Sequence, residues 1–192
     1  MANRVAVKIA DFLCKNNTIR NKDKDIYIYG FEIFLSNLTN FTIVVVLGYL
    51  LNLFYHAMLF YIAFVVTRSY SGGYHASTYL KCHIAFASIF LVTMFMSRLL
   101  LPTISLVYLL VFIAIYIGCI FEYAPIENSN KPLLELDKLK YRKISIVISL
   151  CWTAFVVALY FIAREYAATL TFTLVFVAML MLIEVNKRKE LY

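Results

Sequence analysis

The sequence predicts an all-α protein that crosses a membrane about six times, and two observations support this. Hydrophobic residues make up 63% of the 192 residues and the mean hydropathy is +0.80, whereas ordinary soluble domains are roughly 45–50% apolar. No charged side chain occurs in residues 33–67, 99–121, 144–163 or 166–183. These runs are near the roughly 20 residues that a helix needs to cross a hydrocarbon core of about 30 Å. Helical spans are therefore the default.

The first uncharged run is too long for one span. As a single helix its 35 residues would extend about 52 Å. Gly48 and Asn52 offer a turn, so we expect a helical hairpin with spans near 29–48 and 52–67. The second arm is short, and a re-entrant segment remains an alternative for it.

Four further spans follow, near 84–101, 103–121, 144–163 and 166–184, with Pro102 at the turn between the first two of them. Residues 1–192 are treated as one membrane domain, with a cytoplasmic N-terminus 1–25, a polar segment 68–83, a loop 122–143 and a tail 185–192. Within residues 2–16, apolar side chains recur at helical spacing (Val5, Ile9, Phe12, Leu13). This pattern predicts an amphipathic helix, either on the membrane surface or packed on the bundle.

The basic residues fall into two groups that test the number of spans. The N-terminus holds six, the 68–83 segment two, the 122–143 loop five and the tail three, so 16 of the 18 lie in alternate connections. Only Arg98 and Arg164 lie in the others. The positive-inside rule then predicts that both termini and the 68–83 segment are cytoplasmic. A wrong span count would have mixed the two groups.

The 68–83 segment contains the two side chains best suited to catalysis, His75 and Cys82. The thiolate is the reactive form of cysteine, and nearby cations, imidazolium and a helix N-terminus favour it. Lys81 and His83 flank Cys82, and we expect the third span to begin at Cys82 or just before it. The pattern predicts a cysteine nucleophile with His75 as its base.

Helix geometry constrains this pair. Positions seven apart in a straight helix are separated by about 10.5 Å along its axis, whereas proton transfer needs heavy atoms within about 3–4 Å. Residues 75–82 therefore cannot form a regular helix if the pair is catalytic. Gly72 and Gly73 could supply the bend, since glycine adopts unusual backbone angles at low cost.

Less specific interpretations of these residues remain. A cysteine in a membrane helix is most often a small apolar filler, the role that we assign to Cys119 and Cys151. His83 could replace His75 as the base, but it is the less favoured candidate, because adjacent side chains on a helix diverge by about 100°. A metal site built from His75, Cys82 and His83 lacks a fourth ligand. We expect no metal and no cofactor.

The same segment resembles the active-site segment of the AgrB family, the membrane endopeptidases of bacterial accessory gene regulator quorum sensing. The resemblance consists of Arg68, Gly72-Gly73-x-His75-Ala76 and Cys82, with six residues between the histidine and the cysteine. A second similarity lies in the 122–143 loop, where Ala124-Pro125-x-Glu127-Asn128 precedes Asn130-Lys131-Pro132-Leu133. Chain length, span number and the basic N-terminal segment also fit. The resemblance covers essentially the whole chain.

This resemblance implies a multi-pass cysteine endopeptidase of the bacterial cell membrane. Its substrate would be a short AgrD-like precursor peptide, which loses its C-terminal tail and is cyclised to a thiolactone or lactone. Cys82 would be the nucleophile and His75 the general base and acid. The residues implied in support are Arg68, Gly72 and Gly73 at the site, and Lys131 and Pro132 as substrate or loop contacts. No third residue that orients His75 is marked.

The expected partners are the precursor peptide and membrane lipids, without nucleic acid; the resemblance leaves a homo-oligomer open. The basic loop and N-terminus could attract an acidic precursor tail, although topology alone accounts for these charges. The alternative function is a small transporter or permease without protease activity, in which Arg98 near a membrane end could line a path. The spans carry almost no buried charge, which argues against ion coupling. A purely structural subunit would give no reason for the 68–83 pattern.

Overall fold

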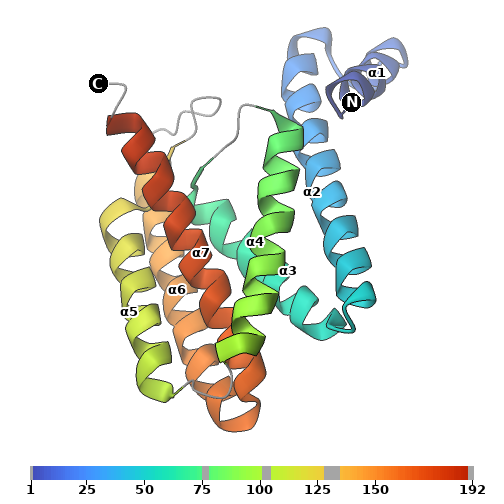
Figure 1. Cartoon of the computed structure of the whole chain (residues 1–192). Helices are drawn as coiled ribbons and strands as arrows, with labels where there is room; N and C mark the ends of the chain where they lie inside the picture. The colour runs from blue at the N-terminus through green and yellow to red at the C-terminus, as the bar shows by residue number, and fades with distance from the viewer. Residues whose placement is uncertain (1, 75–77, 101–104, 128–134, 190–192) are drawn as a thin grey trace.

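The computed structural model describes residues 2–74, 78–100, 105–127 and 135–189, and these residues form helices without any strand (Figure 1). The helices are α1 (Ala2–Lys15), α2 (Lys24–Leu50), α3 (Phe54–Ser71), α4 (Tyr79–Leu100), α5 (Leu106–Tyr123), α6 (Glu135–Ile162) and α7 (Arg164–Lys189), with a short 3-10 helix η1 (Asn21–Asp23) before α2. The predicted all-α fold class is confirmed. The turn predicted at Pro102 lies outside the described residues.

Five of these helices are long and apolar enough to cross a membrane: α2 with η1, α4, α5, α6 and α7. The helix α3, predicted as the second span, is not among them, because its 18 residues include His56 and Arg68. Its two ends contact α7 at different levels. His56 near its start lies 2.9 Å from the hydroxyl of Thr169 in α7, and Tyr74 just after its end donates to the carbonyl of Leu180 (3.1 Å). Thr169 and Leu180 are about three turns apart.

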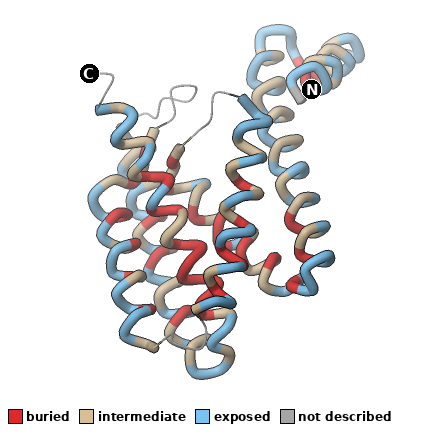
Figure 2. The backbone as a smooth tube through the Cα atoms, in the orientation of Figure 1, coloured by how far each residue is buried: buried red, intermediate tan, exposed pale blue. Residues whose placement is uncertain are grey.

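The helix α7 lies at the centre of the bundle. In its most apolar stretch 61% of the residues are buried inside the protein, compared with 11% in α2, and Figure 2 shows the difference along the two tubes. The helices α3, α4, α5 and α6 all pack against α7. The large apolar surface that the other helices expose is typical of a membrane-facing surface.

The hairpin between α2 and α3 forms close to the predicted turn. Asn52 adopts a left-handed conformation with φ of 54°, and the N–H of Leu53 donates to the carbonyl of Gly48 (2.8 Å). Gly48 itself lies inside α2 rather than in the turn. A Cβ atom at Gly48 would lie 2.6 Å from the Cβ of Ala57, so this glycine allows the two helices to approach closely.

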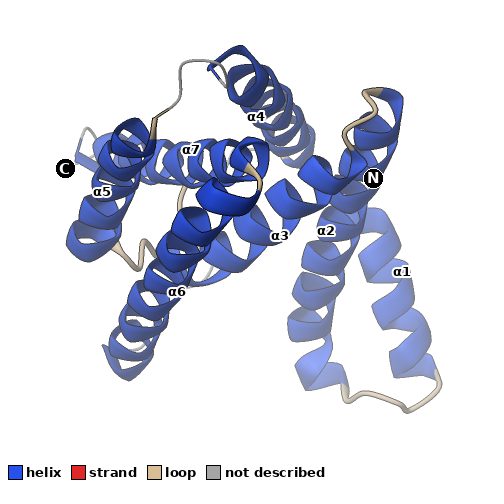
Figure 3. Ribbon diagram, turned by 90° about the horizontal axis from the view of Figure 1, so that it is seen from below, coloured by secondary structure: helices blue, strands red, loops and turns tan. Residues whose placement is uncertain are grey.

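The predicted amphipathic helix is α1, which lies beside the N-terminal part of α2 (Figures 1 and 3). Ala6 and Ala10 are fully buried, and the Lys24 ammonium lies 2.7 Å from the Asp11 carboxylate. Phe12 on the same helix is 65% exposed. One face of α1 is therefore packed on the bundle, while another leaves apolar side chains uncovered.

Candidate functional site

The candidate site begins at a glycine turn where α3 ends. Gly72 and Gly73 have φ values of 75° and 135°, which glycine adopts far more readily than other residues. The N–H of Ile126 donates to the carbonyl of Ser71 (2.9 Å). A Cβ atom at Gly72 would lie 2.1 Å from the Ile126 carbonyl oxygen. Gly72 is therefore in direct backbone contact with the 124–127 loop, which the sequence singled out as a separate motif.

Arg68 lies one turn before the glycines with its side chain largely buried. Its Nη2 group donates to the carbonyl of Tyr74, and its guanidinium carbon lies 5.5 Å from the centre of the Phe64 ring. The Nε atom is buried and has no hydrogen-bond partner among the described residues. Arginine stays protonated in proteins, so this cation needs anionic neighbours. The groups that interact most with its charge are Cys82 and Glu184.

Cys82 shares a small pocket with Arg68. The other residues that line this pocket are largely apolar: Phe64, Tyr74, Ala85, Phe86, Ile89 and Leu180. The thiol is half-buried and forms no disulfide. The Cys82 sulfur therefore shares a largely apolar pocket with the Arg68 guanidinium. The roles of Cys82 as nucleophile and of Arg68 as a supporting residue stay predictions.

The helix N-terminus contributes less than expected, because α4 begins at Tyr79, three residues before Cys82. The hydroxyl of Thr78 accepts from the N–H of Lys81 (3.3 Å), and the N–H of Cys82 donates to the carbonyl of Thr78 (3.1 Å). Cys82 therefore lies at the end of the first turn, where the effect of the helix dipole is already declining.

His75, the predicted base, lies outside the described residues. Its distance to Cys82 therefore stays a prediction, as do the roles of Lys131 and Pro132, which lie in another undescribed stretch, 128–134. The predicted break in helical geometry over 75–82 is restricted by the start of α4, because residues 79–82 are helical. Any bend that brings His75 to Cys82 must lie before Tyr79.

His83 is directed away from this pocket. Its Nδ1 atom lies 2.7 Å from Oδ1 of Asn40 in α2, so its imidazole is committed to a contact between helices. Among the residues that the structure describes, no group of three or more His, Cys, Asp or Glu side chains could hold a metal ion. The zinc alternative depends on His75 and stays untested.

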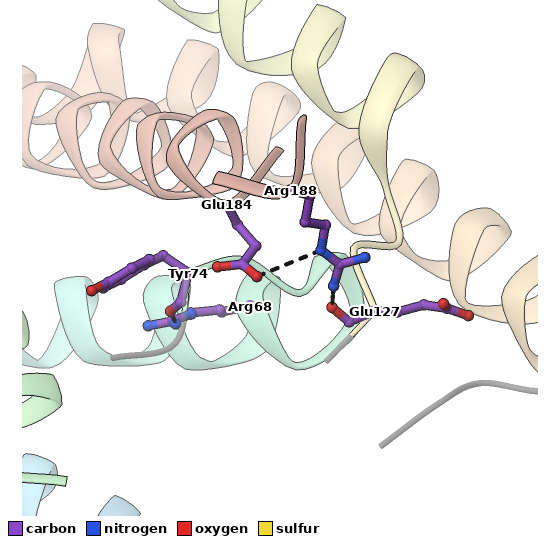
Figure 4. Close-up of polar contacts among 5 residues, drawn as sticks. All are labelled: Arg68, Tyr74, Glu127, Glu184 and Arg188. Carbon is purple, nitrogen blue, oxygen red and sulfur yellow. Dashed lines mark hydrogen bonds and ion pairs between the residues drawn. The ribbon is translucent and has the colours of Figure 1, made fainter. Parts of the chain in front are cut away.

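Sequence reasoning missed two residues near the end of α7. Figure 4 shows Glu184 between Arg68 and Arg188. The Nε atom of Arg188 lies 3.5 Å from Oε1 of Glu184, and its Nη2 group donates to the carbonyl of Glu127. Glu184 is the first charged residue after the uncharged run 166–183, and Arg188 follows on the same helix face. This spacing of four residues could have predicted an ion pair between Glu184 and Arg188 at the end of the span.

A larger, more open cleft lies beside this network. The 123–127 segment forms one wall, and Lys138, Arg188 and Lys189 contribute positive charge to the lining. Lys138 forms an ion pair of 2.9 Å with Glu127. The cleft is therefore a basic surface next to the loop on which the glycine turn rests.

The helical bundle and its membrane-length helices define a polytopic all-α membrane protein. The chain belongs to the Accessory gene regulator B (AgrB) family, whose model matches residues 6–183. This family takes part in the processing of autoinducing peptides. The family membership that the sequence motifs indicated is therefore confirmed.

Relatives with similar sequences carry related names. AgrB-like protein 2 of Clostridium perfringens (strain 13) is 26% identical over 149 residues, which cover 74% of this chain and 69% of the relative. An AgrB-like protein of Clostridium perfringens (strain SM101) is 29% identical over 129 residues, 64% of this chain and 60% of the relative. An AgrB-like protein of Clostridium beijerinckii is 24% identical over 197 residues, covering 100% and 94%. No solved structure gives a significant match.

Proposed function

We propose that this protein is a membrane cysteine endopeptidase that removes the C-terminal tail of an AgrD-like precursor peptide. The observation that carries the proposal is the pocket shared by Cys82 and the buried Arg68. A thiol beside a buried cation can supply the nucleophile that amide cleavage requires. Membership of a peptide-processing family supports the same chemistry.

The first step forms an acyl-enzyme. The Cys82 thiolate attacks the carbonyl carbon at the end of the signal segment and forms a carbon–sulfur bond. His75 donates a proton to the amine nitrogen as the carbon–nitrogen bond breaks. The tail departs with a free amino terminus, and the signal segment stays on Cys82 as a thioester.

The second step closes the ring. A Cys or Ser side chain of the bound peptide loses its proton to His75 and attacks the thioester, which releases a cyclic thiolactone or lactone and restores the Cys82 thiolate. A reactant held in place has a large effective concentration, and exclusion of water suppresses hydrolysis. Replacing an amide by a thioester raises the free energy, so the two-step reaction needs the removal of a product to proceed.

The proposed location is the bacterial cell membrane, with both termini and the active site on the cytoplasmic side of a single membrane domain. The glycine turn, the 124–127 loop and the end of α7 lie at one end of the bundle. The three basic residues of the tail, Lys187, Arg188 and Lys189, follow at this same end. The positive-inside rule assigns such an end to the cytoplasm.

The basic cleft is the proposed binding surface for the precursor's tail. Lys138, Arg188 and Lys189 would attract acidic residues there, and Lys131 and Pro132 belong to the loop that leads into α6. Membrane lipids surround the exposed apolar helices. A homo-oligomer is compatible with this arrangement.

The function is tested by co-expressing the chain with a candidate AgrD-like precursor peptide. Cys82→Ala and His75→Ala should each lower tail cleavage, measured by mass spectrometry, by at least about 100-fold. Cys119→Ala and Cys151→Ala are matched controls and should leave cleavage near the unsubstituted level. Immunoblots of the membrane fraction compare protein amounts. Tail cleavage that survives Cys82→Ala would falsify the proposed cysteine-protease function and leave the transporter as the alternative.

A further inference from the structure

We propose that Glu184 is a positioning residue of the active site, which holds the Arg68 guanidinium beside Cys82. The inference rests on the proposed thiol-protease function. It assigns to the end of α7 a role in the reaction that the glycine and cysteine motifs do not reveal.

The first line of support is how few contacts hold Arg68. Within the described residues its guanidinium donates one hydrogen bond, to the carbonyl of Tyr74, and its Nε atom has no partner. Tyr74 is itself fixed to α7, since its N–H donates to the carbonyl of Leu180 (3.1 Å) and Lys187 lies 5.6 Å from the centre of its ring. The backbone contact that holds Arg68 is thus provided by a residue docked on α7.

The second line of support is the position of the Glu184 carboxylate between two cations. Oε1 lies 3.5 Å from Nε of Arg188, while Oε2 is buried without a hydrogen-bond partner in the described residues. Figure 4 shows Arg68 on the other side of this carboxylate, and Glu184 interacts electrostatically with Arg68. A buried carboxylate oxygen is unfavourable without a cation nearby; Arg188 forms the ion pair with Glu184, and Arg68 supplies a second positive charge.

The third line of support is the balance of charge. Arg68 and Arg188 carry two positive charges against the single negative charge of Glu184. The remaining positive charge is available to a thiolate at Cys82, which is the other group that interacts with Arg68. Arg188 is also fixed to the 124–127 loop through the carbonyl of Glu127. The network therefore links both sequence motifs to the charge beside the nucleophile.

Positioning and simple charge repulsion predict opposite results when Glu184 is neutralised. The Glu184 charge alone disfavours a thiolate, so its removal would make Cys82 react at lower pH if Arg68 stayed in place. If Glu184 holds Arg68, its removal lets the guanidinium move away and Cys82 reacts only at higher pH. Among the described residues, the other titratable groups near Cys82 are unchanged in both cases: Tyr79, Lys81 and His83 in α4, and Glu32 in α2, which accepts from Tyr79.

The experiment uses the full chain in lipid nanodiscs and follows alkylation of Cys82 by iodoacetamide against pH, with mass spectrometry of the peptide that contains it. Glu184→Gln should raise the pH midpoint by about one unit and lower tail cleavage at neutral pH about tenfold. Glu184→Asp keeps the charge but shortens the side chain, and should give a smaller upward shift. Glu122→Gln, at an exposed position in α5, is the matched control and should change neither quantity.

A pH midpoint that stays the same or falls in both Glu184 variants would overturn the inference. A variant that is only less stable would give less protein with an unchanged midpoint, which also counts against the inference. The proposed function fails separately, if Cys82→Ala retains cleavage. If Cys82→Ala abolishes cleavage while both Glu184 variants behave like the unsubstituted protein, only the positioning role is wrong.

Discussion

The helices α7 and α2 are similar in length and hydropathy but occupy opposite environments. They contain 26 and 27 residues, and the mean hydropathy of their most apolar stretches is 2.2 and 1.8. The interior helix begins with small and hydroxylated side chains, Ala167, Ala168, Thr169, Thr171 and Thr173, all buried. The peripheral helix exposes large ones, including Ile33, Phe34, Leu38 and Phe41.

This contrast shows that hydropathy indicates a membrane helix, whereas side-chain size indicates its place in the bundle. Small residues let neighbouring helices approach closely. Two of their hydroxyl groups are satisfied locally: Thr169 donates to the carbonyl of Glu165 (3.0 Å) and Thr173 to that of Thr169 (2.7 Å). Since α7 also carries Leu180, Glu184 and Arg188, substitutions around α7 should affect the site more than substitutions in α2.

The largest contrast is expected between two glycines, Gly72 at the site and Gly30 in α2. Gly72→Ala places a Cβ atom 2.1 Å from a backbone oxygen at a φ of 75°, which should destabilise the fold by about 4 kcal/mol or more. Nothing lies within 4 Å of a Cβ atom at Gly30, so Gly30→Ala should stabilise α2 by roughly 0.5–1 kcal/mol. Thermal unfolding in nanodiscs and tail cleavage measure both effects. Equal stability of the two variants would contradict the close backbone contact.

The second contrast compares leucines truncated in the two helices. Leu174 in α7 is fully buried, and Leu174→Ala should cost about 2–5 kcal/mol because it leaves a cavity among packed side chains. Leu38 in α2 is 49% exposed, and Leu38→Ala should cost clearly less, since the surrounding lipid fills the space. Denaturation in mixed micelles gives the two values. A larger cost at Leu38 would mean that α2 has a protein neighbour, such as a second copy of the chain.

Much of the fold follows from local sequence, because long uncharged runs dictate helices wherever their ends lie. The bounds differ where polar residues still form helix: α3 continues through Arg68 to Ser71, and α4 already begins at Tyr79. Hydropathy averages could not reveal this, since a polar turn at a membrane edge can be helical. The position of α7 at the centre was also not predicted, although its buried alanines and threonines were a signal.

The candidate site could be proposed from its sequence motifs, but its contacts could not be predicted. The residue pattern identified Cys82, Arg68 and the glycine pair. It could not show that Gly72 rests on Ile126, because the two are more than fifty residues apart and only the fold joins them. Glu184 was missed for the same reason: on the sequence it marks the end of a span, and only the packing of α7 against α3 places its charge near Arg68.

The smallest contrast is expected between two ion pairs, Asp11–Lys24 at the periphery and Glu184–Arg188 at the site. The side chains of Asp11 and Lys24 are 45% and 34% exposed, so solvent and salt screen their attraction, and Asp11→Asn should cost less than about 1 kcal/mol. Any loss should shrink further at 0.5 M salt, measured by thermal unfolding in nanodiscs, and tail cleavage should be unchanged. Glu184→Gln removes a carboxylate from a pair whose acidic partner is only 15% exposed, and its effect on Cys82 should persist at the same salt concentration. If Asp11→Asn instead reduced cleavage as much as Glu184→Gln, α1 would have to act on the site through α2, and the division between interior and periphery would be wrong.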